Sequence, residues 1–156
     1  AWWACVLWMG WYGPALMLLF VLSHLAMTRD SCRGELRLIL LSTGLGIGLD
    51  NALAAAGVVT YVGEILVGGS PLWLVAIWMG FGATLRHSQA VLVRTFQNAL
   101  LTGCVGGPLA YLGGQRLGCL AVSGSWGWLA VSVLWTIALA TLYWAAATRP
   151  QQPPVV

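Results

Sequence analysis

Five long apolar runs, separated by short polar or glycine-rich connections, constrain this chain more than any other feature. They cover residues 13–28, 36–59, 71–93, 96–118 and 126–148. A helix needs about 20 apolar residues to cross roughly 30 Å of hydrocarbon, and four or five of these runs approach that length. The chain is 60% hydrophobic and 7% charged, which excludes an ordinary soluble domain. The sequence therefore predicts an all-α protein, a polytopic transmembrane helical bundle with five full spans.

The first residues are also apolar and aromatic. Residues 1–9 would cover only about 14 Å as a helix, too little to span a bilayer. We interpret them as the outer part of a first helix whose beginning this chain lacks. We expect one transmembrane domain over residues 1–156, ending in a cytoplasmic tail at residues 149–156.

The arginines predict the orientation, because basic residues are retained on the cytoplasmic side of a membrane. Arg29, Arg33 and Arg37 mark one connection, Arg94 marks another two spans later, and Arg149 follows the last run. These sites, and the C-terminus, are expected in the cytoplasm. The net charge of +3 is too small for a nucleic-acid surface, so we expect no nucleic-acid partner.

Asp50 lies deep inside the second apolar run. An unpaired charge at such a depth costs roughly 2.5–3.5 kcal/mol on insertion scales. It shares a helical face with small residues, including Gly46 and Ala54, so we expect it to face another helix rather than lipid. Depth along the spans favours Arg116 as its ion-pair partner, with Arg86 as the alternative.

A kink or break is predicted in the fourth full run. Pro108 removes a backbone donor and disfavours helical geometry at Gly107, next to Gly106. Pro108, Tyr111 and Gln115 share a face that could line a cavity, because freed carbonyls in a membrane must be covered. The alternative is that the glycines of this run only permit tight helix packing.

The other polar residues in the runs have both structural and functional interpretations. Asn51 fits an interhelical hydrogen bond and His24 a packed polar residue. His87, on one face with Ser88, suits either packing or proton exchange. A metal or haem held by His24 and His87 has no supporting ligand spacing, and the four cysteines show none, so we expect no metal and no cofactor.

Two motifs carry a family resemblance through nearly the whole chain. The chain resembles a small bacterial inner-membrane family known only as a domain of unknown function. The resemblance rests on Thr84-Leu85-Arg86-His87-Ser88 and Gly106-Gly107-Pro108-Leu109, together with Asp50-Asn51. The resemblance implies a compact bundle of six helices in intact members, shared polar positions at Asp50, His87, Ser88 and Tyr111, and localisation in the bacterial inner (plasma) membrane. In relatives the position of Arg86 is often Asn. The resemblance also implies a genomic setting among genes for fatty-acid modification, including cyclopropane synthesis.

Three functions remain open from the sequence. The leading one is binding or moving a lipid or amphiphile in a polar intramembrane cavity near Asp50, His87 and Tyr111. The alternatives are a membrane-embedded enzyme or enzyme subunit of lipid modification, with His87 as base and Asp50 as orienting acid, and a structural partner that recruits a peripheral lipid-modifying enzyme. Membrane lipids are expected partners, and a homo-oligomer is left open.

Overall fold

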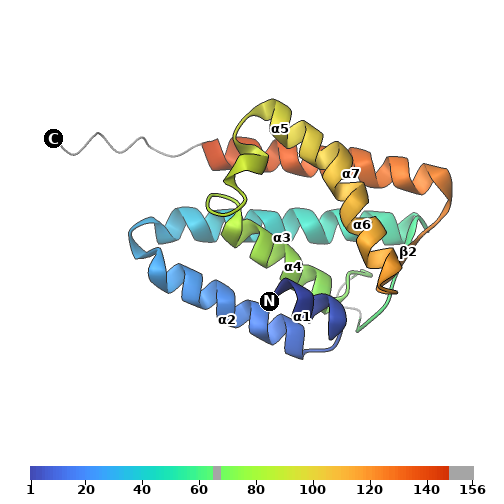
Figure 1. The fold of residues 1–156 in the computed structure, drawn as a ribbon, viewed down its shortest axis with the longest axis horizontal. Helices are drawn as coiled ribbons and strands as arrows, with labels where there is room; N and C mark the ends of the chain where they lie inside the picture. Colours follow the sequence, from blue (N-terminus) through green and yellow to red (C-terminus); the bar gives the residue numbers. More distant parts are fainter. Residues whose placement is uncertain (65–67, 148–156) are drawn as a thin grey trace.

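The computed structural model describes residues 1–64 and 68–147 and shows two long antiparallel helices at its centre. They are α3 (Cys32–Ala55) and α7 (Gly124–Ala147), which lie side by side along the length of the protein (Figure 1). Both consist mainly of apolar residues with good helical propensity, and α3 has Glu35 in its first turn. These two helices form the framework on which the shorter helices pack.

Shorter helices cover this pair from two sides. On one side, α2 (Tyr12–Met27) packs against α4 (Leu72–Thr84), and α4 packs on α3 (Figure 1). The short helix α1 (Trp2–Leu7) packs on both α2 and α4. On the other side a continuous helical run packs on α7; its parts are α5 (Phe96–Leu101), the π-helical turn η3 (Thr102–Gly106) and α6 (Gly107–Arg116). Two short 3₁₀ turns, η1 (Arg29–Ser31) and η2 (Ala90–Val93), complete the helical elements of the described chain.

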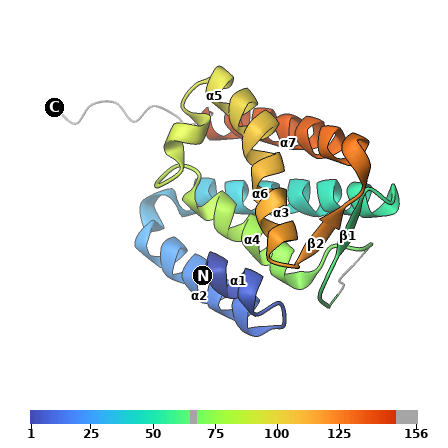
Figure 2. The ribbon, with the colours of Figure 1, turned by 45° about the vertical axis from the view of Figure 1, so that its right-hand side comes forward.

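A two-stranded antiparallel ribbon closes one end of the bundle. Strand β1 (Val59–Tyr61) follows α3, and β2 (Leu120–Val122) precedes α7, with Tyr61 opposite Leu120 (Figure 2). Backbone bonds from Val62 N to Cys119 O at 2.9 Å and from Ser123 N to Val58 O at 2.8 Å extend the pairing. The ribbon fixes the two connections at this end against each other.

The all-α prediction is confirmed. By length and composition, two segments are long and apolar enough to cross a membrane, Arg29–Ala55 and Gly124–Ala147; the apolar helices α2 and α4 are shorter. The third predicted run is also interrupted, because α4 ends at Thr84 instead of continuing to residue 93. The chain turns there, and Arg86 and His87 point back toward α3. The predicted tail, residues 149–156, lies outside the described residues.

Candidate functional site: two buried carboxylates and an apolar cavity

Asp50 lies at the centre of the first polar cluster and is 1% exposed. Its Oδ1 accepts hydrogen bonds from the Tyr61 hydroxyl, at 2.9 Å, and from the Tyr111 hydroxyl. Its Oδ2 accepts one from the indole Nε1 of Trp78 at 2.9 Å. Three neutral donors from β1, α4 and α6 therefore surround the carboxylate, which is how a buried anion is stabilised without a counter-ion.

Local structure explains how these donors converge. Gly46 lies one turn before Asp50, and its missing side chain makes room for the Trp78 ring; a Cβ there would stand 2.1 Å from Trp78 Cγ. The β1–β2 pairing holds Tyr61 over the end of α3. Burial, and then the Asp50 carboxylate, raise the pKa of Tyr61, so its hydroxyl stays protonated and donates.

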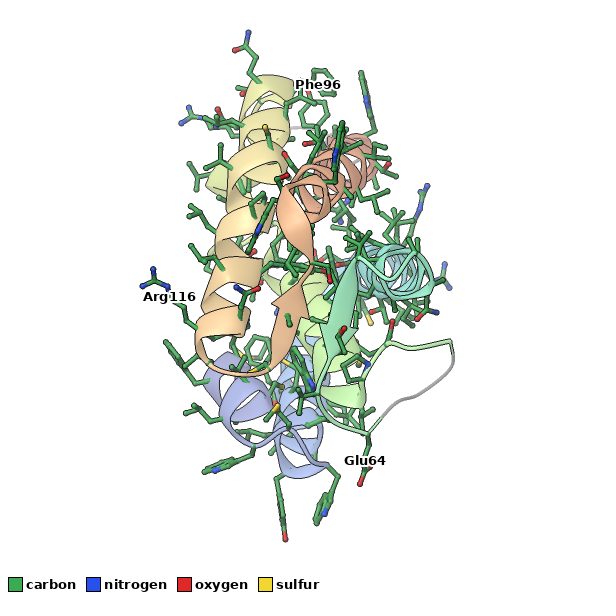
Figure 3. The ribbon with its side chains drawn as sticks, turned by 90° about the vertical axis from the view of Figure 1, so that its right-hand side faces the viewer. Glu64, Phe96 and Arg116 are labelled. Atoms are coloured by element: carbon green, nitrogen blue, oxygen red, sulfur yellow. The ribbon has the colours of Figure 1, made fainter. Side chains whose placement is uncertain are left out.

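The predicted ion pair between Asp50 and an arginine is wrong. Within residues 1–64 and 68–147, no arginine pairs with Asp50. Arg116 is exposed and extends away from the protein (Figure 3), and Arg86 contacts Glu35 instead. The reason is that phenol and indole donors already satisfy the carboxylate.

Enlarging Gly46 should break this arrangement. We expect Gly46→Ala to lower the free energy of unfolding by about 1–3 kcal/mol, because the new methyl group would overlap the Trp78 ring. Gly48→Ala, on the same helix with nothing within 4 Å of the added Cβ, is the matched control. It should be neutral or stabilising by about 0.5–1 kcal/mol through helix propensity. Equal unfolding midpoints for the two purified variants would contradict the packing described here.

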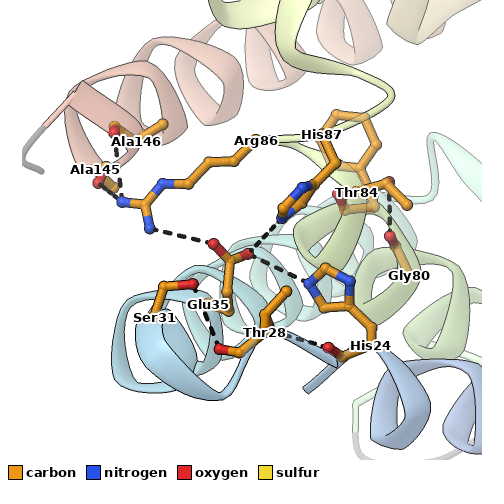
Figure 4. A network of polar contacts seen from close by, with 11 residues as sticks. His24, Thr28, Ser31, Glu35, Gly80, Thr84, Arg86, His87, Ala145 and Ala146 are labelled. Carbon is orange, nitrogen blue, oxygen red and sulfur yellow. Dashed lines mark hydrogen bonds and ion pairs between the residues drawn. The ribbon is translucent and has the colours of Figure 1, made fainter. Parts of the chain in front are cut away.

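Glu35 is the centre of a second polar cluster and is fully buried. Its Oε2 lies 3.4 Å from His24 Nε2 and 3.4 Å from His87 Nε2, while Oε1 lies 3.8 Å from the Arg86 guanidinium (Figure 4). The same guanidinium donates to the carbonyl oxygens of Ala145 and Ala146, both at 3.3 Å. Arg86 thus neutralises Glu35 and caps the C-terminus of α7, where carbonyls lack helical partners.

Sequence reasoning missed Glu35 because it adjoins the polar, arginine-bearing connection at residues 29–35. A signal was present, since the buried face of α3 continues from Asp50 through Ser42 and Leu38 to Glu35 at three- and four-residue spacing. His87 therefore belongs with Glu35, whereas Asp50 has other partners. The structure does not bring His87 and Asp50 together as the predicted base and orienting acid.

The remaining predicted residues have separate surroundings. Asn51 Oδ1 accepts hydrogen bonds from the Ser70 backbone N at 2.9 Å and from the Ser70 hydroxyl at 2.6 Å. Asn51 thus holds the residues just before α4 and does not bond to the middle of another helix. Gln115 Oε1 accepts from Val122 N at 2.9 Å and so secures β2. Ser88 is exposed. None of these three hydrogen-bonds to Asp50 within the described chain.

The predicted irregularity around Pro108 takes a specific form. The run stays helical, but the π turn η3 precedes Gly107, and Pro108 lies in the first turn of α6. Gly107 packs on α7, where a Cβ would stand 2.4 Å from Trp135 Cγ; Gly106 has no comparable neighbour on another helix. A π turn realigns the residues that follow it, and here Tyr111 on α6 reaches Asp50.

An apolar cavity of about 660 Å³ lies between the two groups of shorter helices. Aromatic side chains form much of its wall, contributed by Trp2, Phe20, Trp73, Trp78, Phe81, Tyr111 and Trp135. Trp78 and Tyr111 direct their polar atoms to Asp50, which leaves their ring faces for the cavity. Asp50 thus supports the cavity wall without being among its lining residues.

Two residues of the wall each carry a polar atom with no hydrogen-bond partner in the part of the chain that the structure describes. These atoms are Gln89 Oε1, an acceptor, and Trp135 Nε1, a donor, and both are buried. Buried polar groups are usually hydrogen-bonded, and because both atoms are buried, neither is exposed to the cavity. The cavity volume falls in the range of small-molecule sites, roughly 300–1,000 Å³.

Comparison with known proteins gives a family and no established activity. The chain matches no curated protein and no solved structure. Residues 1–141 match a family described as "Protein of unknown function (DUF2878)". This match covers most of the 156 residues. The chain therefore belongs to the DUF2878 family, whose function is unknown.

Proposed function

We propose that this chain is a multi-pass protein of the bacterial inner membrane that binds an amphiphile in the cavity between α2, α4, α6 and α7. The observation that carries the proposal is the cavity itself, which is about 660 Å³ in volume and largely aromatic. An apolar chain suits such a wall because its burial is favourable at about 25 cal/mol per Å².

The distribution of basic residues supports a cytoplasmic location for the end of the bundle that carries Glu35. The connection carrying Arg29 and Arg33 is next to Glu35, and Arg86 links Glu35 to the last turn of α7. These basic residues thus lie near the start of α3 and the last turn of α7, while the β1–β2 ribbon follows α3 and precedes α7 at the other end of the bundle (Figure 2). Placing the arginine-bearing end in the cytoplasm satisfies the positive-inside preference.

Filling the cavity should reduce ligand binding. Both Leu109 and Ala110 of α6 are exposed, but Ala110 lines the open side of the cavity whereas Leu109 lies outside the lining. We expect Ala110→Trp to lose retained amphiphile, because an indole would occupy part of the volume; a cost of 1.4 kcal/mol already lowers affinity about tenfold. Leu109→Trp adds the same ring to the outer face and should retain the ligand. Native mass spectrometry with lipid analysis of the purified proteins measures the occupancy.

The two variants also separate a cavity ligand from lipid bound to the outside. A defined amphiphile retained by wild type and Leu109→Trp, and lost from a folded Ala110→Trp, would support the proposal. The same amphiphile retained equally by all three proteins would overturn it.

A further inference from the structure

The second cluster combines three side chains that are common metal ligands. One ring nitrogen from each of His24 and His87 and one carboxylate oxygen of Glu35 all lie within 4.8 Å of one another, and Figure 4 shows the three side chains converging. His24 comes from α2, Glu35 from the first turn of α3, and His87 from the turn after α4. His24 and Glu35 lie on successive helices and His87 is 52 residues beyond Glu35, so the packing of these helices brings the three side chains together.

The distances between the two imidazoles and the Glu35 carboxylate are those of long hydrogen bonds, and they are also close to the separation of neighbouring metal ligands. Each histidine nitrogen lies 3.4 Å from Glu35 Oε2, beyond the usual N–H···O range of about 2.7–3.2 Å. Two ligands at bond lengths near 2.0–2.1 Å, set at a tetrahedral angle around zinc, are separated by about 3.4 Å. The two nitrogen-to-oxygen distances therefore match two edges of such a coordination shell, whereas the two histidine nitrogens, which lie within 4.8 Å of each other, must approach to complete the third edge around a bound ion.

The donor set selects the class of metal. Two imidazoles and one carboxylate suit zinc and similar transition-metal ions, whereas magnesium and calcium prefer oxygen ligands alone. The side chains of Glu35 and His24 are 0% and 13% exposed, while that of His87 is 41% exposed, so an ion can reach the cluster from the His87 side. A fourth position there would be filled by water or another ligand.

The positive charge of Arg86 opposes a cation at this cluster, and the position of Arg86 limits the conflict. It lies on the Oε1 side of Glu35, 3.8 Å away, and donates to the carbonyls of Ala145 and Ala146. These carbonyls, at the negative end of α7, offset part of its charge. Arg86 thus orients the carboxylate by one oxygen, while Oε2 faces the two histidines.

We propose that His24, Glu35 and His87 form a binding site for a zinc-class divalent transition-metal ion at the end of the bundle that carries Glu35. The proposal rests on these contacts and is independent of what the cavity binds.

The test uses the purified full chain with no polyhistidine tag. After chelator treatment and dialysis, Zn²⁺ binding is measured by calorimetry, and bound metal is counted by elemental analysis. Because the chain has only two histidines, the variants His24→Gln and His87→Gln examine every imidazole in it. We expect about one ion per chain for wild type, and an affinity at least roughly tenfold weaker in each variant.

Two controls make the result decisive. His87→Gln alters a partly exposed side chain, so it should fold even if His24→Gln does not. Cys104→Ser, at an exposed thiol, should bind zinc as wild type does. Replacing Zn²⁺ by Co²⁺ should give visible absorption bands that weaken in the histidine variants. No stoichiometric binding by wild type, or equal binding by wild type and a folded His87→Gln, would overturn the proposal.

Discussion

Replacing Glu35 with alanine is expected to lower the free energy of unfolding by about 3–5 kcal/mol, the usual cost of removing one partner from a buried ion pair. Glu35 is fully buried and faces His24, Arg86 and His87. Without the carboxylate, the largely buried Arg86 guanidinium loses its anion. Chemical unfolding of the purified protein in detergent, followed by circular dichroism, measures the change.

Glu64 provides the matched control for this prediction. It is an exposed glutamate in the connection after β1, and it extends outward from the bundle (Figure 3). Glu64→Ala should change the unfolding free energy by less than about 0.5 kcal/mol, as is usual for surface substitutions. If Glu35→Ala were as mild as Glu64→Ala, the buried cluster would not stabilise the junction of α2, α3 and α7 as described.

Replacing Asp50 with alanine should have the second large effect, a loss of about 3 kcal/mol. The substitution leaves the Tyr61, Tyr111 and Trp78 donors without their acceptor, and each unsatisfied buried donor costs about 1–3 kcal/mol. The total stays below the sum because the two tyrosine hydroxyls, 3.2 Å apart, can still bond each other. Thermal and chemical unfolding in detergent should both report the loss.

Two further variants sharpen the Asp50 prediction. Asp30→Ala, at an exposed aspartate in η1, should be nearly neutral. Asp50→Asn should be intermediate, because its amide oxygen can still accept from the tyrosines while its NH₂ group opposes the indole N–H of Trp78, which can only donate. An Asp50→Ala protein that unfolds at the Asp30→Ala midpoint would contradict the account of this cluster.

Much of the helical framework was predictable because apolar runs, and the polar or glycine-rich connections that separate them, are local features of the sequence. The stripe of small residues around Gly46 correctly predicted that Asp50 is buried. The partners of Asp50 were not predictable in the same way. The prediction sought an opposite charge at matching depth, whereas the structure uses neutral phenol and indole donors, one of them from a β-ribbon formed by residues 59–61 and 120–122.

Glu35 illustrates a different limit. Beside several arginines in a short polar connection, it has the composition of a solvated turn, and only its helical register with Leu38 and Ser42 indicates burial. Its juxtaposition with His24 and His87 depends on how α2, α3 and α4 cross. No spacing within one helix encodes that crossing, so the cluster emerges only from the three-dimensional fold.

Crosslinking of a photoactivatable fatty acid to the protein in membranes, followed by mapping of the labelled residues, tests directly whether the cavity binds an amphiphile. We expect labels on cavity-lining residues such as Met17, Ile77 and Leu92, and loss of these labels in Ala110→Trp but not in Leu109→Trp. Labels confined to outward-facing residues such as Leu19 and Leu40, unchanged in Ala110→Trp, would contradict the claim that the cavity binds an amphiphile.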